Sequence, residues 1–119
     1  MNWYLTKLVF RIVCGDGDHT PQFDEQLRLV QAEDAFHAFQ KAQRMGHKEQ
    51  DSFYNAREKL VQWKFIDVSE IHTLEELADG AEIYSRINEE EDADIYTRII
   101  RLRAKQLFEE TMQQSFQHN

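Results

Sequence analysis

The residues best suited to chemistry lie together in one short segment, Cys14-Gly15-Asp16-Gly17-Asp18-His19. A thiol, two carboxylates and an imidazole are side chains that transition metals bind. Structural zinc needs four protein ligands, however, and no second Cys/His pair follows at a fitting spacing. A calcium loop starting at Asp16 would place Pro21 where glycine is required. We therefore predict a polar connection between strands, no metal and no cofactor, with these weak metal candidates: Cys14, Asp16, Asp18 and His19.

A cysteine–histidine nucleophile is the other chemistry that this segment suggests. Cys14 could pair in space with His19 or His72, and the imidazole would then activate the thiol. No local sequence signature supports such a pair, and a cysteine at a strand end is commonly a small buried apolar residue. The chain also lacks a glycine-rich phosphate loop that leads into a helix. The sequence therefore indicates no catalytic residues and favours a protein that is not an enzyme.

Two periodicities divide the chain into the elements that must position these residues. Apolar–polar alternation predicts strands over residues 3–13, 23–31, 60–74 and 81–87, with a short strand at 53–54. Three- and four-residue spacing predicts helices over 32–45 and 94–116, the first ended by Gly46. Alternation breaks at Ile66-Asp67, which indicates a bulge.

These elements predict an α+β fold, namely an antiparallel sheet of four to five strands with one crossing helix and a long C-terminal helix. A length of 119 residues is typical of one domain. We expect residues 1–119 to form that domain. The sheet and first helix would occupy residues 1–88, and the last helix residues 92–116.

The predicted C-terminal helix carries more apolar surface than one neighbour can cover. A helix on its own sheet needs a single apolar stripe, but the apolar side chains of residues 94–116 spread around the helix. A second copy of the chain would cover the excess, so we predict a homodimer. The alternative is that the last turns fold back onto their own chain or fray. The predicted interface residues are Ile99, Leu102, Phe108, Met112 and Phe116.

An acidic run, Glu89-Glu90-Glu91-Asp92, precedes this helix. Carboxylates are favourable at a helix N-terminus because they face the positive end of the helix dipole. The same run could bind a basic protein partner. Both interpretations remain open at this stage.

Three residues from two of the predicted strands suggest a pocket as an alternative function. Trp63, His72 and Tyr84 could form its wall, between the sheet and the C-terminal helix. Such a pocket would belong to a small-molecule-binding protein or an enzyme of minor activity. Exposed aromatic residues can also stack nucleic-acid bases, but that surface needs basic neighbours. Here 22 acidic residues outnumber 14 basic ones, so packing is the better explanation.

Composition narrows the partners and the compartment. The formal net charge of −8 argues against non-specific nucleic-acid binding and against an anionic membrane surface. One cysteine allows no internal disulfide, which fits a reducing compartment. The first residues do not resemble a signal peptide, and no stretch approaches the ~20 apolar residues of a membrane helix. We therefore expect a cytoplasmic protein.

Several spaced segments resemble one known family in the same order. They are the strand Trp3-Tyr4-Leu5-Thr6-Lys7-Leu8-Val9-Phe10, the helix region 32–46, the strand Val61-Gln62-Trp63-Lys64-Phe65 and the segment Gly80-Ala81-Glu82-Ile83-Tyr84-Ser85-Arg86. They resemble the bacterial family known as domain of unknown function 4288, over roughly residues 3–88. The resemblance implies a bacterial origin and a small α+β domain, and it supplies no activity or catalytic residues.

Taken together, these observations favour a non-enzymatic, cytosolic interaction or regulatory module that acts as a homodimer. The absence of a recognisable catalytic motif and the wide apolar surface of the last helix both point that way. The alternative remains the small-molecule-binding protein or minor enzyme described above.

Overall fold

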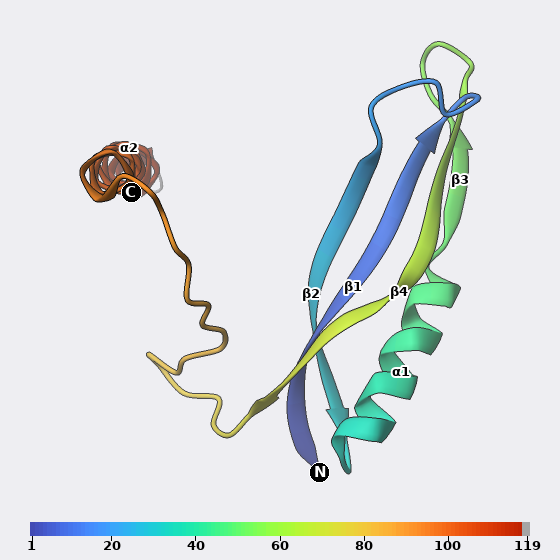
Figure 1. Ribbon diagram of the computed structural model, residues 1–119, viewed down its shortest axis with the longest axis horizontal. Coiled ribbons are helices and arrows are strands. Elements are labelled where there is room, and N and C mark those ends of the chain that lie inside the picture. Colours follow the sequence, from blue (N-terminus) through green and yellow to red (C-terminus); the bar gives the residue numbers. More distant parts are fainter. Residues whose placement is uncertain (118–119) are drawn as a thin grey trace. The chain divides into compact units, whose positions relative to one another are not determined.

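The computed structural model describes residues 1–117, which form two compact units. The first unit, Met1–Ser85, holds four strands and one helix. In chain order these are β1 (Asn2–Cys14), β2 (Gln22–Ala32), α1 (Ala35–Lys48), β3 (Asp51–Tyr54) and β4 (Leu60–Leu74). The second unit, from Arg86 onward, holds α2 (Ala93–Gln117) (Figure 1). The predicted α+β class is confirmed, with both helices present, while the extent of the single domain stays a prediction.

The strands form one antiparallel sheet in the order β2-β1-β4-β3. β1 lies in the middle and pairs along its length with both β2 and β4 (Figure 1). The β1–β2 register runs without interruption from Asn2 opposite Ala32 to Ile12 opposite Gln22. This long hairpin was predicted because both strands alternate in the sequence.

β4 contains two extra residues relative to β1. Lys7 pairs with Glu70 and Leu8 with Val68, so Ser69 has no partner on β1. A second shift between Val9 and Phe10 leaves Ile66 unpaired in the same way. The bulge predicted at Ile66-Asp67 is therefore confirmed. Bulges of this kind bend a strand and increase its twist.

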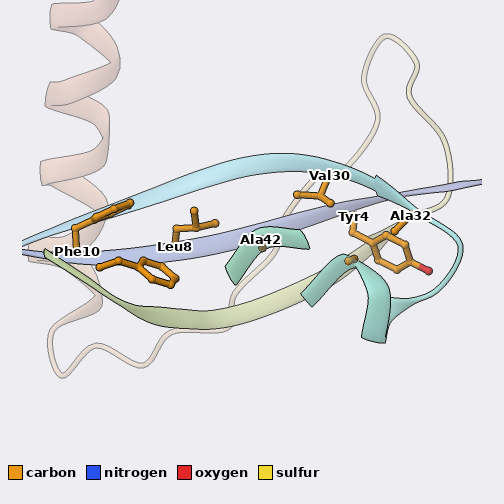
Figure 2. Close-up of a cluster of buried hydrophobic side chains, with 8 residues drawn as sticks. Tyr4, Leu8, Phe10, Val30, Ala32 and Ala42 are labelled. Carbon is orange, nitrogen blue, oxygen red and sulfur yellow. The ribbon is translucent and has the colours of Figure 1, made fainter. Parts of the chain in front are cut away.

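The core lies between one face of the sheet, here called the inner face, and α1 (Figure 2). Leu8 and Phe10 from β1 are fully or almost fully buried in it. α1 contributes Ala38 and Ala42, both with no exposed surface, and these small side chains allow the helix to approach closely. Asp34 caps α1, because its carboxylate accepts a hydrogen bond of 2.8 Å from the backbone N–H of His37.

Gly46 does not end the first helix, contrary to the prediction. α1 continues to Lys48, and Gly46 is buried within it. A Cβ atom at this position would overlap three atoms of the Phe65 ring, which belongs to β4. Gly46 is therefore needed for close packing and does not serve as a helix terminator.

The strand predicted at 81–87 is absent from the described residues, and the segment is irregular. Tyr84 from this segment contacts the sheet. The Tyr84 ring lies 5.2 Å from the His72 ring, edge to face, and 5.9 Å from Lys7 Nζ. An extended segment that crosses the face of a sheet can show the same alternation as a paired strand. The Asp79-Gly80 turn before it is present, with Gly80 at φ +84°.

The polar side chains of β2, and not its large apolar ones, face the core side of the sheet. Its polar residues share the inner face with α1, while its larger apolar residues lie on the opposite face, here called the outer face. The polar set is Asp24, Gln26 and Arg28, and the apolar set is Phe23, Leu27 and Leu29. The members of the apolar set are 54%, 52% and 50% exposed, respectively.

α2 begins at a capped N-terminus. The Asp92 carboxylate accepts a 3.0 Å hydrogen bond from the backbone N–H of Ile95, and its carbonyl accepts one of 3.1 Å from Tyr96. This is the usual geometry of an N-cap aspartate. The helix predicted over 94–116 therefore runs over Ala93–Gln117.

Candidate functional site

The β1–β2 loop and the β3–β4 turn lie at the same end of the sheet (Figure 1), and residues of both line a cleft. Its volume is about 660 Å³. The lining residues are Cys14, Gly15, Asp16, Asp18, His19, Thr20, Gln22, Asn55, Arg57 and Lys59. All four weak metal candidates from the sequence therefore lie around this cleft.

His19 holds its own loop together. Its Nε2 accepts a 3.0 Å hydrogen bond from the backbone N–H of Cys14, so this nitrogen carries no proton. Its Nδ1 lies 2.9 Å from the carbonyl of Thr20, to which it donates. Both ring nitrogens are engaged within the loop, so a metal ion or a substrate proton could reach the imidazole only by replacing one of these hydrogen bonds. No group of three or more His, Cys, Asp or Glu side chains within residues 1–117 is placed to hold a metal ion.

The thiol of Cys14 faces the turn between β3 and β4. Asn55 donates its side-chain N–H to Cys14 Sγ over 3.7 Å. The side-chain oxygen Oδ1 of Asn55 also accepts hydrogen bonds from the backbone N–H groups of Arg57 and Lys59, at 2.9 and 3.1 Å. Asn55 therefore organises the turn and connects it to β1. Sequence reasoning missed Asn55, Arg57 and Lys59, because the turn lies far from Cys14 along the chain.

The register of the sheet excludes the other predicted cysteine–histidine pair, Cys14 with His72. Cys14 pairs with Val61 at one end of β1, whereas His72 pairs with Leu5 near the other end. Consecutive residues of a strand advance by about 3.3 Å. The thiol and the His72 imidazole are therefore too far apart to exchange a proton.

The sheet separates the three residues predicted as one pocket wall. Trp63 lies on the inner face, where its ring packs against the core and stacks on Phe53 at 6.2 Å. His72 and Tyr84 contact each other on the outer face. The structure thus brings His72 and Tyr84 together and leaves Trp63 apart from both.

The outer face also carries a small charged cluster next to His72. Lys7 Nζ lies 2.6 Å from Glu70 Oε2, and His72 Nε2 lies 3.6 Å from Glu70 Oε1. The hydrogen bond from Lys7 lowers the pKa of Glu70, and Glu70 raises the pKa of Lys7. His72 Nε2 itself is buried without a hydrogen-bond partner in the described part of the chain.

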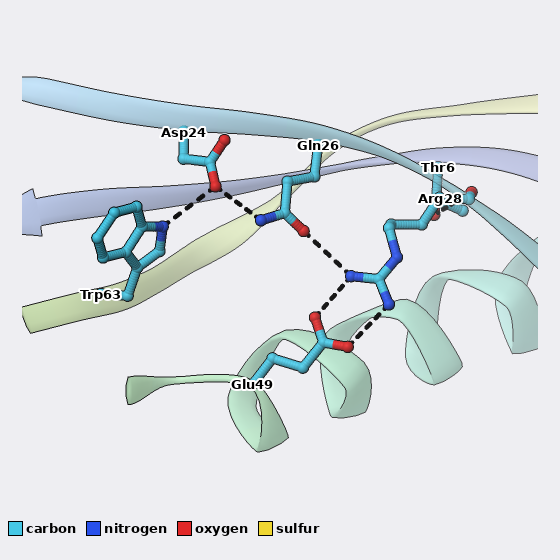
Figure 3. A network of polar contacts seen from close by, with 6 residues as sticks. All are labelled: Thr6, Asp24, Gln26, Arg28, Glu49 and Trp63. Carbon is cyan, nitrogen blue, oxygen red and sulfur yellow. Dashed lines mark hydrogen bonds and ion pairs between the residues drawn. The ribbon is translucent and has the colours of Figure 1, made fainter. Parts of the chain in front are cut away.

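A continuous polar network crosses the inner face at β2 (Figure 3). Trp63 Nε1–H donates to Asp24 Oδ2 over 3.1 Å, and Gln26 donates to the same oxygen over 2.7 Å. Arg28 donates to Gln26 over 3.0 Å and forms two further bonds to Glu49, of 2.6 and 2.8 Å. The side-chain hydrogen bonds between Arg28 and Glu49 hold the pKa of Glu49 below its usual range and raise the pKa of Arg28. The network fixes the end of α1 to β2.

The Arg28–Glu49 pair makes stability depend on pH. Because the pKa of Glu49 is lower in the folded chain, the pair stabilises the fold above the ordinary glutamate pKa of about 4.3. This contribution to stability is lost as the pH falls through the lower pKa that Glu49 has in the folded chain. The side chains are 33% and 40% exposed, so it amounts to about 1 kcal/mol or less.

We therefore expect Glu49→Gln to lower the free energy of unfolding at about pH 7 and to match the wild type near pH 3. Glutamine resembles protonated glutamate, which is why the two proteins should converge. Urea denaturation at each pH measures both values. A difference of the same size at both pH values would contradict this origin.

The acidic run and the predicted interface residues belong to the second unit. Asp92 is used as the N-cap of α2, as described above, and Asn88 donates to Glu90 over 2.9 Å. Glu89 and Glu91 are exposed. The five predicted interface residues are 43–72% exposed, and they are Ile99, Leu102, Phe108, Met112 and Phe116.

Comparison with known proteins identifies one family. Among the described residues, neither helix combines the length and apolar character that a membrane crossing requires. Searches of the curated proteins and of the solved structures found no match. The family model described as "Domain of unknown function (DUF4288)" matches residues 3–85, which confirms the resemblance predicted from the spaced segments. This match includes all four strands and α1, so the chain belongs to that family.

Proposed function

We propose that this protein is a non-enzymatic, cytosolic interaction module that acts as a homodimer through α2. α2 supports the proposal most directly, because nine of its large apolar side chains are 41–72% exposed. They are Ile95, Tyr96, Ile99, Ile100, Leu102, Leu107, Phe108, Met112 and Phe116. Exposed apolar surface of this extent is typical of a protein–protein contact.

The spacing of these residues favours an assembly over a single docking surface. Ile95, Ile99 and Leu102 recur at four- and three-residue steps along one side of α2. Phe108 and Met112 lie on another side, since each residue turns the helix by about 100°. A helix that is apolar on several sides is normally buried on several sides. A second copy of α2 supplies one of the surfaces needed.

The charges along α2 favour an antiparallel pair. Its first half carries four basic residues, Arg98, Arg101, Arg103 and Lys105, and one acidic residue, Asp94, whereas its second half carries only the acidic Glu109 and Glu110. Antiparallel packing places the basic half of one helix beside the acidic residues of the other, whereas parallel packing places like charges together. Charge complementarity therefore favours the antiparallel orientation of the two helices.

The remaining features fit an interaction module better than an enzyme. Both nitrogens of His19 are engaged within its loop, and the Cys14 thiol accepts a hydrogen bond from Asn55. The exposed Glu89 and Glu91 place negative charge before each α2 and suit a basic protein partner. A lone cysteine is consistent with a cytosolic location.

Solution mass and directed cross-linking test the proposal. We expect sedimentation analysis to give twice the mass of one chain. In a Cys14→Ser background, chains carrying Asp94→Cys should form disulfides with chains carrying Ser115→Cys. Neither variant should cross-link with itself, because the two positions lie at opposite ends of α2. Self-linked Asp94→Cys would contradict antiparallel pairing, and a monomer at high concentration would contradict the dimer.

A further inference from the structure

β2 is a long strand at the edge of the sheet, and the edge that faces away from β1 has no neighbouring strand in the described chain. It spans 11 residues, lies at the end of the strand order and pairs only with β1 within the described chain. Its register with β1 contains no bulge, and proline is absent from the strand. Natural proteins shield such an edge with a bulge, a proline, a short strand length or inward-pointing charges, and of these β2 carries only the charges, Asp24 and Arg28. A regular edge of this length is a template for another strand.

The sequence of β2 is complementary to itself when two copies run antiparallel. Centred on Gln26, the pairing places Asp24 opposite Arg28 of the partner subunit, and the reverse pair forms at the symmetric position. On the other face, Phe23 lies opposite Leu29 of the partner subunit, again twice. Directly opposite residues in antiparallel strands share a face, so both kinds of contact form together.

Neighbouring registers lose this complementarity. A shift by two residues in one direction places Glu25 opposite Glu25 of the partner subunit, where like charges repel. A shift in the other direction places Asp24 opposite Val30 and Arg28 opposite Gln26 of the partner subunit, so both Asp24–Arg28 pairs are lost. Odd shifts would join opposite faces of the two sheets. The register centred on Gln26 is therefore favoured.

We infer that β2 pairs antiparallel with β2 of a second copy, so that two sheets join into one across a two-fold axis. The inference deepens the proposed homodimer and rests on it, because it assigns a second contact to the same pair of chains. The half-exposed apolar row Phe23, Leu27 and Leu29 then continues into the row of the partner subunit along the shared outer face. This pairing also gives partners to the backbone groups along the open edge.

Amide hydrogen exchange in the full chain, followed by NMR, tests this pairing. Every second amide of β2 faces the open edge, and we expect these amides to be protected at concentrations where the dimer forms. Leu29→Lys should weaken protection of those amides at least 10-fold, because it places a charge opposite Phe23 of the partner subunit. Ile66→Lys is the matched control, since Ile66 is 52% exposed on β4, and it should leave them protected.

The possible outcomes distinguish the β2 contact from the α2 contact. Edge amides that exchange freely in a dimeric wild type would overturn β2 pairing and leave the α2 dimer standing. Protection that survives dilution to the monomer, or that is equal in wild type and Leu29→Lys, would also overturn it. Protection that is lost both on dilution and in Leu29→Lys supports the shared sheet. A chain that is monomeric at every concentration removes both contacts.

Discussion

Replacing Gly46 with alanine is expected to destabilise the first unit by about 2 kcal/mol, even though alanine is the better helix former by about 1 kcal/mol. The added methyl group would overlap the Phe65 ring. That ring cannot retreat freely, because it packs against Phe10 at 5.4 Å and against His47 at 5.0 Å. Urea denaturation of wild type and variant gives the change in the free energy of unfolding.

A second substitution identifies the cause of that loss. In a Phe65→Leu background the ring is absent, so Gly46→Ala should cost at least about 1 kcal/mol less than in the wild type. Arg44→Ala is the control, because Arg44 is exposed on the same helix, and it should change stability by no more than about 0.5 kcal/mol. An equal loss from Gly46→Ala in both backgrounds would show that contact with Phe65 is not responsible.

Leu102→Asp is expected to separate the proposed dimer into monomers. Leu102 lies on the same side of α2 as Ile95 and Ile99 and is 55% exposed in the single chain, so the substitution leaves the chain's own core intact. In a helix pair it would bury a carboxylate without a partner. We expect the dissociation constant to rise by about 30-fold or more, which corresponds to about 2 kcal/mol. Sedimentation over a range of concentrations measures the constant.

The control for this experiment is a polar position on the same helix. Thr97→Asp introduces the same side chain at a position that is already polar, so no apolar contact is lost, and it should leave the dimer intact. Circular dichroism should show the same helix content in both variants. A dimer that survives Leu102→Asp would mean that α2 is not the contact that joins the chains.

Local patterns were enough to predict most of the sheet. β1, β2 and β4 alternate strongly, and the break in alternation at Ile66 marks a bulge that the register confirms. Gly46 was misassigned because a glycine near a helix end usually terminates the helix. The residue that requires it, Phe65, belongs to a strand that follows later in the chain.

Parts of the candidate site depend on contacts that the sequence does not reveal. The sequence singles out the Cys14–His19 segment, and a cleft of about 660 Å³ lies there. The residues opposite it, Asn55 and Lys59, come from a distant hairpin. Trp63 and His72 are an odd number of positions apart, which places them on opposite faces of a regular strand. Two bulges, at Ile66 and Ser69, leave that parity unchanged, so the separation was accessible to sequence reasoning.

The family match ends at residue 85, and the first compact unit ends at Ser85. The part of the chain that the family model matches is therefore a scaffold that contains its own core, and α2 lies beyond it. Evolution can exchange or lengthen such an appended helix without disturbing the inherited fold. Members of one lineage can then differ in how they associate while they keep the same sheet.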